Sequence, residues 1–332
     1  MPAFDLRAHT HLLVVAGSRA YGLHRPDSDV DLRGIAVPPA AYLHGFDKRF
    51  EQADRSGDLD VFRDLLTEVE RSAETSKVEG SVFDLIKFMR LAADANPNML
   101  DLLFGRPDEV RLQTEIGRRL RASRAMFLSK KVGQTYAGYA RGQLKRIRGH
   151  RGWLEDPPEH EPTRAEYGLP EHALLAREQL VAADKATKTG VIAFDPAVVA
   201  VLQRERRYHA ARTRWEQYRT WLKQRNPDRA RLEQDFGYDT KHAMHLVRLL
   251  RMGLEILTTG EVHVWRGGRD REELLAIRSG AWTYEALLTF AEEQGEALQS
   301  ALETSSLPDR PDRDALDALC VSLVQEALAQ TG

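Results

Sequence analysis

One short segment limits the folds open to this chain more than any other part of the sequence. An apolar run rich in β-formers, residues 11–16, ends at a Gly17-Ser18 step. Two aspartates, Asp29 and Asp31, follow and stand one residue apart. The pattern predicts a buried strand, then a tight turn or short helix, then a second strand entered through the aspartates.

The two aspartates predict a cation site. Residues i and i+2 of a strand point to the same face, so Asp29 and Asp31 can aim both carboxylates at one point. Carboxylates held that close repel each other unless a cation lies between them. Mg²⁺ favours such oxygen ligands together with substrate phosphates, and Mn²⁺ suits the same donors. The backbone N–H groups of Gly17 and Ser18 can face phosphate oxygens.

Composition places the chain among ordinary globular proteins. Its 332 residues can hold a sizeable core and two lobes, and a net charge of −2 gives no bulk attraction to polyanions. The single cysteine, Cys320, excludes an intramolecular disulfide and points to a reducing compartment. No apolar run is long enough to span a bilayer, and no secretory signal is recognisable, so we expect a cytoplasmic protein.

The first third of the chain mixes strand and helix patterns. We expect strands over residues 30–37 and 78–83, and an amphipathic helix over 85–92 that stops at an Asn-Pro-Asn sequence. Residues 100–104 form a further candidate strand. The highly charged residues 47–76 are expected to make an exposed excursion with some helix.

From about residue 109 the pattern is helical. Residues 173–225 predict long helices, and a well-marked helix over 240–259 is followed by Gly260. The sequence thus predicts an α+β protein with an N-terminal lobe of residues 1–105, followed by a basic, mostly α-helical lobe of residues 106–332.

A metal site of this kind can take a third carboxylate from a neighbouring strand. Glu79, on the predicted strand 78–83, is the first candidate. Asp84 is the rival, although strand alternation would place it on the opposite face from Glu79.

Two basic segments can contact phosphates. In the helix over 240–259, Lys241, His245 and Arg248 are spaced to form one stripe, with His242 beside them. Residues 129–147 combine cations with Tyr136, Tyr139 and Gln143, a mixture suited to phosphates and stacked bases. The alternative for the first segment is a solvated cationic face, and for the second it is a basic surface helix whose tyrosines belong to the core.

The order Gly17-Ser18, a gap, then Asp29-x-Asp31 resembles the signature of the DNA polymerase β-type nucleotidyltransferase superfamily. The longer string from residue 17 to residue 31 resembles one branch, the RlaP-like predicted nucleotidyltransferases found beside RNA ligases. It contains Tyr21-Gly22 and Pro26-Asp27-Ser28. Residues 129–147 and 237–248 resemble the same branch.

This resemblance implies a small mixed-sheet, polymerase β-like palm lobe and a metal-dependent nucleotidyltransferase. It implies transfer of a nucleoside monophosphate from an NTP, ATP among the candidates, to an RNA end in a repair pathway associated with an RNA ligase. The metal-binding and catalytic residues would be Asp29, Asp31 and Glu79. Nucleotide contacts would come from Gly17, Ser18, Arg19, Ser28, Lys241, His242, His245 and Arg248.

Two alternative functions stay open. The same chemistry can modify a protein, as in antitoxin-like nucleotidyltransferases that adenylylate a toxin. A non-catalytic RNA-binding protein on a retired catalytic fold is the other. The large basic helical lobe favours RNA as the acceptor.

Overall fold

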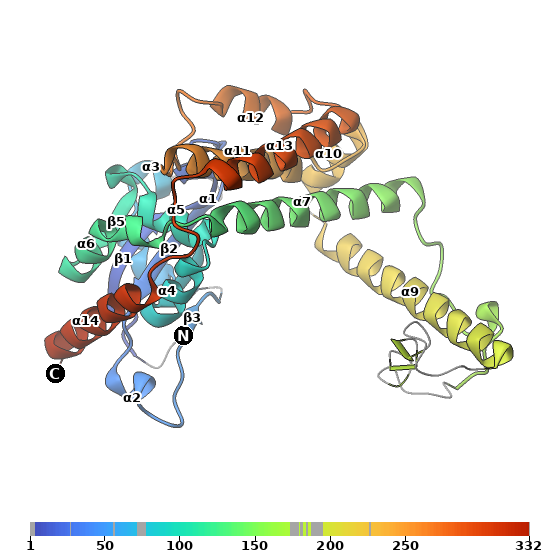
Figure 1. The fold of residues 1–332 in the computed structure, drawn as a ribbon, viewed down its shortest axis with the longest axis horizontal. Coiled ribbons are helices and arrows are strands. Elements are labelled where there is room, and N and C mark those ends of the chain that lie inside the picture. Colours follow the sequence, from blue (N-terminus) through green and yellow to red (C-terminus); the bar gives the residue numbers. More distant parts are fainter. Residues whose placement is uncertain are drawn as a thin grey trace. The chain divides into compact units, whose positions relative to one another are not determined.

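The computed structural model describes residues 4–331 except 27, 56, 72–77, 226 and most of 173–194 (Figure 1). The chain divides into two compact units. Unit 1 combines residues 1–146 with 240–332, and unit 2 contains residues 147–239. This division differs from the predicted lobes of residues 1–105 and 106–332, which stay a prediction.

Unit 1 is built on a mixed five-stranded sheet with the order β3-β4-β2-β1-β5. The central strands β2 and β4 are parallel, and the other neighbours are antiparallel. The strands are β1 (Thr10–Val15), β2 (Val30–Ala36), β3 (Gln52–Ala53), β4 (Val78–Asp84) and β5 (Val110–Gln113). The strands predicted over 11–16, 30–37 and 78–83 are confirmed.

The sheet is held by its central strands. Every residue of β1 is buried, and β2 contributes Val30 and Leu32 to a core that also contains Val82 of β4. Such β-branched and aliphatic runs are typical of strands covered on both faces.

Short helices lie between these strands and directly after the last one. They are α1 (Gly17–Ala20), α2 (Ala40–Leu43), the 3-10 helix η1 (Asp60–Leu65), α3 (Glu68–Arg71), α4 (Leu85–Ala93), α5 (Pro97–Phe104) and α6 (Glu115–Ala122). Short 3-10 turns also occur before β5, after α6 and at residues 165–167.

The predicted strand over residues 100–104 is wrong, because this segment belongs to helix α5. The Asn96 side chain accepts a hydrogen bond from the Asn98 N–H, and Pro97 occupies the first turn. The Asn-Pro-Asn sequence therefore begins a new helix as well as ending the previous one. The short strand β5 also lies within a region that was expected to be helical.

The charged segment 47–76 is only partly an exposed excursion. Phe62 is fully buried, and Leu59 and Leu66 join it in the core beneath the sheet. These apolar side chains anchor the segment despite its charge. Residues 56 and 72–76 lie outside the described part.

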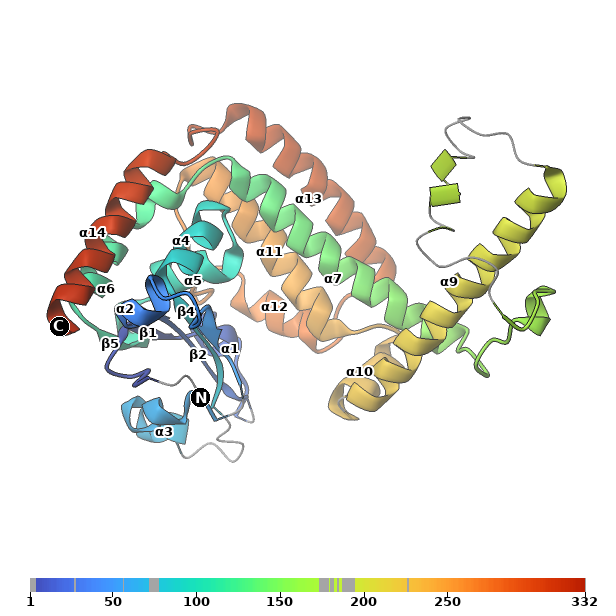
Figure 2. The ribbon, with the colours of Figure 1, turned by 90° about the horizontal axis from the view of Figure 1, so that it is seen from below.

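The later helices of unit 1 pack side by side (Figure 2). Gly253 of α11 (Thr240–Thr259) fits between Tyr136 of α7 (Lys131–Glu155) and Leu298 of α13 (Tyr284–Thr304), where even a Cβ would lie 2.9 Å from Tyr136. The predicted helix over 240–259 is thereby confirmed. Helices α12 (Arg271–Arg278) and α14 (Arg313–Thr331) complete the unit.

Unit 2 contains the last turns of α7, then α9 (Pro196–Gln224) and α10 (Pro227–Phe236). Buried ion pairs hold it internally: Arg164 donates to Glu205 at 2.9 Å and Arg225 to Glu233 at 2.8 Å. The long helix expected within 173–225 is confirmed from residue 196, and most of 173–194 lies outside the described residues.

The predicted fold class is confirmed: a mixed sheet near the N-terminus is followed by a mostly helical region. Among the residues that the structure describes, no helix combines the length and apolar character needed to cross a membrane.

Candidate functional site

Three carboxylates meet at one end of the parallel pair β2–β4. Asp31 and Glu79 are direct register partners, so their side chains lie next to each other on one face of the sheet. Asp29 precedes Asp31 by two residues and is exposed. The negative charges of Glu79 and Asp29 both act on Asp31. The structure thus brings together the three carboxylates expected from the sequence.

Burial is the main influence on the Asp31 carboxyl and raises its pKa above the ordinary value of 3.8. Arg33 and Lys241 lower this pKa, whereas Glu79 and Asp29 raise it, and the net shift is upward. A half-buried carboxylate beside two others is costly to ionise without a cation. This donor set therefore fits a hard divalent ion such as Mg²⁺ or Mn²⁺.

Asp84 lies at the other end of β4. It caps helix α4, where its carboxylate accepts a hydrogen bond from the Lys87 N–H at 3.2 Å, and burial raises its pKa. The register pairs it with Ala36 rather than with an acid of β2. Its place in the fold is that of a helix cap.

The Gly-Ser turn lies directly against Asp31. Gly17 has φ +61°, and a Cβ there would approach the Asp31 carboxylate oxygen to 1.9 Å. The Ala16 N–H donates to the Asp31 carbonyl at 2.8 Å, which fixes the end of β1 to β2. Only glycine fits this position, because the Asp31 carboxylate occupies the space that a Cβ would need.

The loop between α1 and β2 is held by its own polar groups. Arg19 donates to the Ser28 carbonyl at 3.1 Å, and the Ser28 hydroxyl accepts from the Arg25 N–H at 2.9 Å. These bonds shape the approach to Asp29. Asp27 lies outside the described residues.

Helix α11 brings one predicted cation to the carboxylates. Lys241, in its first turn, lies close enough to lower the pKa of Asp31. His242 is buried and His245 is half-buried on the following turn. Their contacts with a nucleotide stay a prediction.

Arg248 differs from the exposed cation that the helical stripe suggests. It is 6 % exposed, and its guanidinium lies 3.6 Å from the centre of the Tyr21 ring. The Tyr21 hydroxyl donates a hydrogen bond to the buried carboxylate of Asp101. Burial raises the pKa of Asp101, and the charge of Arg248 opposes that shift.

This buried cluster was not expected from the sequence. Asp101 stands alone in the apolar run Met99–Phe104, and a single acid in such a run was the available signal. The same run also fits a strand, in which a single acid gives no sign of a buried polar cluster.

The basic stretch 129–147 divides between core and surface. Tyr136 is fully buried, whereas Tyr139 is 38 % exposed and its hydroxyl accepts from the Asn96 side chain at 2.8 Å. The exposed cations of α7 in unit 1 are Arg141, Lys145 and Arg146.

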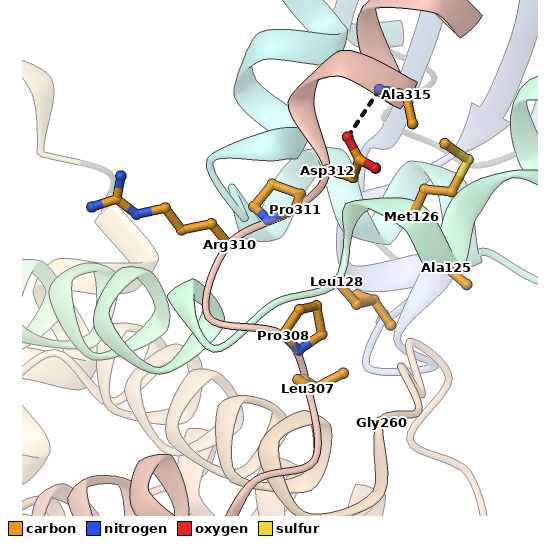
Figure 3. A pocket seen from close by; sticks show the side chains of 10 residues that line it. All are labelled: Ala125, Met126, Leu128, Gly260, Leu307, Pro308, Arg310, Pro311, Asp312 and Ala315. Atoms are coloured by element: carbon orange, nitrogen blue, oxygen red, sulfur yellow. Dashed lines mark hydrogen bonds between the residues drawn. The ribbon is translucent and has the colours of Figure 1, made fainter.

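A separate cavity of about 480 Å³ lies where the α13–α14 connection passes the segment 125–128 (Figure 3). Its lining is mainly apolar, including Met126, Leu128 and Leu307. Asp312, at its edge, caps α14 by accepting from the Ala315 N–H at 3.0 Å, and Arg310 extends away from the cavity. No predicted site residue lines it.

Comparisons with known proteins agree with this reading of the N-terminal region. Residues 6–154 match the model of the RNA repair pathway DNA polymerase beta family, RlaP. The resemblance inferred from the sequence is thereby confirmed over that range, which contains all three carboxylates.

A relative from Enterobacteria phage T4 is the uncharacterized 38.9 kDa protein in the nrdC-mobD intergenic region. It is 28 % identical over 140 residues, which cover 41 % of this chain and 38 % of the phage protein. The chain therefore spans well under half of this relative's length. No solved structure is significantly similar to the chain.

Proposed function

We propose, with the match to the RNA repair pathway DNA polymerase beta family as premise, that this protein is a metal-dependent nucleotidyltransferase. It transfers a nucleoside monophosphate from an NTP to an acceptor hydroxyl, with pyrophosphate leaving. The observation that carries the proposal is the cluster of Asp29, Asp31 and Glu79 against the Gly17 turn. Neighbouring carboxylates beside a bare backbone turn suit a metal-bound triphosphate.

Each group has a defined part in this proposal. Asp29, Asp31 and Glu79 would hold Mg²⁺ or Mn²⁺, which supplies charge stabilisation at the transferred phosphoryl group. The backbone of Gly17 and Ser18 and the ammonium of Lys241 would bind the triphosphate oxygens. Glu79 is exposed and can accept the proton of the acceptor hydroxyl while the new O–P bond forms and the bond to pyrophosphate breaks.

RNA is the proposed acceptor, and a repair pathway that includes an RNA ligase is the proposed setting. Arg141, Lys145 and Arg146 are exposed on α7, with Tyr139 on the same helix. Cations contact phosphates without reading sequence, and an exposed aromatic ring can stack on a base.

The experiment that tests the proposal incubates the pure protein with each α-labelled NTP, Mg²⁺ or Mn²⁺, short RNAs and total cellular protein. Label on RNA that is absent with Asp31→Asn supports RNA nucleotidyl transfer and identifies the base. Label on a protein band would replace RNA by a protein acceptor. Absence of label with every NTP, while RNA is still bound, would favour the non-catalytic alternative.

Alanine at Glu79 and at Asp84 should separate the metal site from the helix cap. For Glu79→Ala we expect transfer to fall about 100-fold or more, because a carboxylate of the metal site is lost. For Asp84→Ala we expect transfer close to wild type and a stability loss of about 1 kcal/mol from the missing cap. Rate assays and urea unfolding measure both, and the reverse pattern would make Asp84 the third carboxylate.

Lys241→Ala should weaken NTP binding. Loss of one charge-assisted contact with phosphate, worth about 1.5 kcal/mol, corresponds to about a tenfold rise in KM for the NTP. The matched control is Lys223→Ala, since Lys223 is an exposed lysine of α9 in unit 2. Equal KM values for the two variants would remove Lys241 from the site.

A further inference from the structure

Three consecutive backbone carbonyls just after α1 accept hydrogen bonds from the region around α12. The Tyr21 carbonyl accepts from the Arg266 N–H at 3.1 Å. The Gly22 carbonyl accepts from Arg271 Nε at 2.6 Å, and the Leu23 carbonyl accepts from Arg278 Nη1 at 3.2 Å. The turn that follows Gly17-Ser18 is therefore held by residues about 250 positions later in the chain.

The same turn is packed as well as hydrogen-bonded. Gly22 has φ +71°, and a Cβ there would lie 2.7 Å from the ring of Trp265. The guanidinium of Arg106 lies 3.9 Å from the centre of a Trp265 ring. Trp265 is thus held between Gly22 of the turn and the Arg106 side chain.

Arg266, the first of these donors, is fixed to α11. Arg266 is 1 % exposed and forms ion pairs with Glu255 and Asp270, each at 2.7 Å. Arg251 of α11 also contacts Asp270 at 3.1 Å. These buried, charge-assisted bonds give the α11–α12 connection a defined shape.

Arg278 contacts both the segment after α1 and the start of α11. Its side chain holds the Leu23 carbonyl, and its own carbonyl accepts from the Thr240 hydroxyl at 2.8 Å. Thr240 is fully buried, and the next residue is Lys241, whose charge acts on Asp31. One residue therefore connects the segment after α1 to the start of α11.

We propose that Arg271 and Arg278 are positioning residues, which fix the turn after Gly17-Ser18 and the first turn of α11 relative to the carboxylates. This inference rests on the proposed function, because the geometry being fixed is that of a nucleotide site. Helix α1 has only four residues and is too short to be stable by itself, so its placement must come from tertiary contacts.

Small displacements of such a turn have large kinetic effects. A shift of about 1 Å in a group that binds the reacting phosphate can cost on the order of 100-fold in rate. The carbonyls of Gly22 and Leu23 lie five residues from Gly17 and Ser18, and the Leu23 N–H bonds the Ser18 carbonyl at 2.8 Å. Loss of the arginine contacts would therefore reach the phosphate-facing backbone directly.

The test compares Arg271→Ala and Arg278→Ala with Arg278→Lys and the control Arg269→Ala. Arg269 is an exposed arginine of the same connection. Hydrogen exchange at residues 17–24 and steady-state kinetics are measured on the full-length protein below its unfolding temperature.

We expect faster hydrogen exchange at residues 17–24 in Arg271→Ala and in Arg278→Ala. In Arg269→Ala we expect the exchange rates of the wild type. We expect kcat to fall about 10–100-fold with a smaller rise in KM for the NTP, because preorganisation is lost rather than binding alone. Arg278→Lys should recover most of kcat, since its ammonium can still donate to the Leu23 carbonyl.

The exchange measurement does not depend on activity, so it separates the two possible failures. If the wild type transfers no nucleotide, the proposed function fails, yet faster local exchange in Arg278→Ala would still support the positioning role. If residues 17–24 exchange as in wild type and only the unfolding temperature falls, the positioning role is wrong. Unchanged kcat in an active enzyme would overturn it equally.

Discussion

Asp31→Asn should reduce nucleotidyl transfer by about 10²–10³-fold, which corresponds to several kcal/mol of lost transition-state stabilisation. Asparagine keeps the shape of the side chain but removes the charge that would hold the metal. Asp31 is the carboxylate to look at first, because it lies between Glu79 in the sheet register and Gly17 in the turn. The fold should persist, since Arg33 and Lys241, the cations that act on Asp31, are only partly buried.

The same substitution should raise stability in the absence of metal. The folded-state pKa of Asp31 is raised, so its favourable contribution exists when it is protonated, below the ordinary pKa of 3.8. That contribution is lost as the pH rises through the higher folded pKa. At neutral pH the ionised carboxylate therefore destabilises the metal-free protein, and Asp31→Asn removes this cost.

Thermal unfolding with and without Mn²⁺ measures both effects. Metal at ten times its Kd should stabilise the wild type by about 1.4 kcal/mol, and Asp31→Asn by much less. The advantage of the variant in metal-free buffer should shrink as the pH falls toward 4. The control is Asp47→Asn at an exposed position. Equal transfer or equal metal stabilisation in wild type and Asp31→Asn would exclude Asp31 as a ligand.

Strands β1, β2 and β4 could be predicted from the sequence because they carry local signals, whereas the short edge strands β3 and β5 could not. The apolar run of β1 and the alternation in β2 and β4 are local patterns, which do not depend on the segments that pack against these strands. Helix α5 could not be separated from a strand in this way, since the apolar residues 99–104 fit either structure. The Asn96 cap and Pro97 at the first turn make this segment a helix, but the same two residues also fit the end of α4.

In the candidate site, too, some features have a local sequence signal and others depend on tertiary contacts. Asp29, Asp31 and Gly17 belong to one contiguous motif, so the sequence suggests them together. Glu79 was a candidate because it lies on a predicted strand, with Asp84 as its rival. The register that sets Glu79 against Asp31 is a tertiary fact. Likewise, nothing local shows that Arg278 reaches the Leu23 carbonyl, because hydrogen bonds between distant segments leave no periodic pattern.

Arg248→Ala should destabilise the folded protein by about 3–5 kcal/mol, the range seen when one charge of a buried cluster is removed. Arg248 lies over the Tyr21 ring, and its charge is a main influence that favours the ionised form of buried Asp101. Without it, Asp101 would have to remain protonated or stay charged at high cost. For a unit of this size the loss corresponds to a fall of about 10 °C in Tm.

Arg248→Lys should lie between alanine and wild type, since lysine keeps the charge but not the flat guanidinium stacked on Tyr21. Adding Asp101→Asn to Arg248→Ala should recover part of the loss, because it removes the carboxylate left without its counter-charge. Urea unfolding of the wild type, Arg248→Ala, Asp101→Asn and the double variant measures this coupling. A cation that served only to bind nucleotide would behave differently: Arg248→Ala would keep the wild-type Tm and raise KM for the NTP, and Asp101→Asn would restore nothing. That outcome would assign Arg248 the phosphate-binding role suggested by the stripe on α11. Large, coupled losses of stability would instead make Arg248 part of the core that supports Tyr21 and the turn beside Asp31.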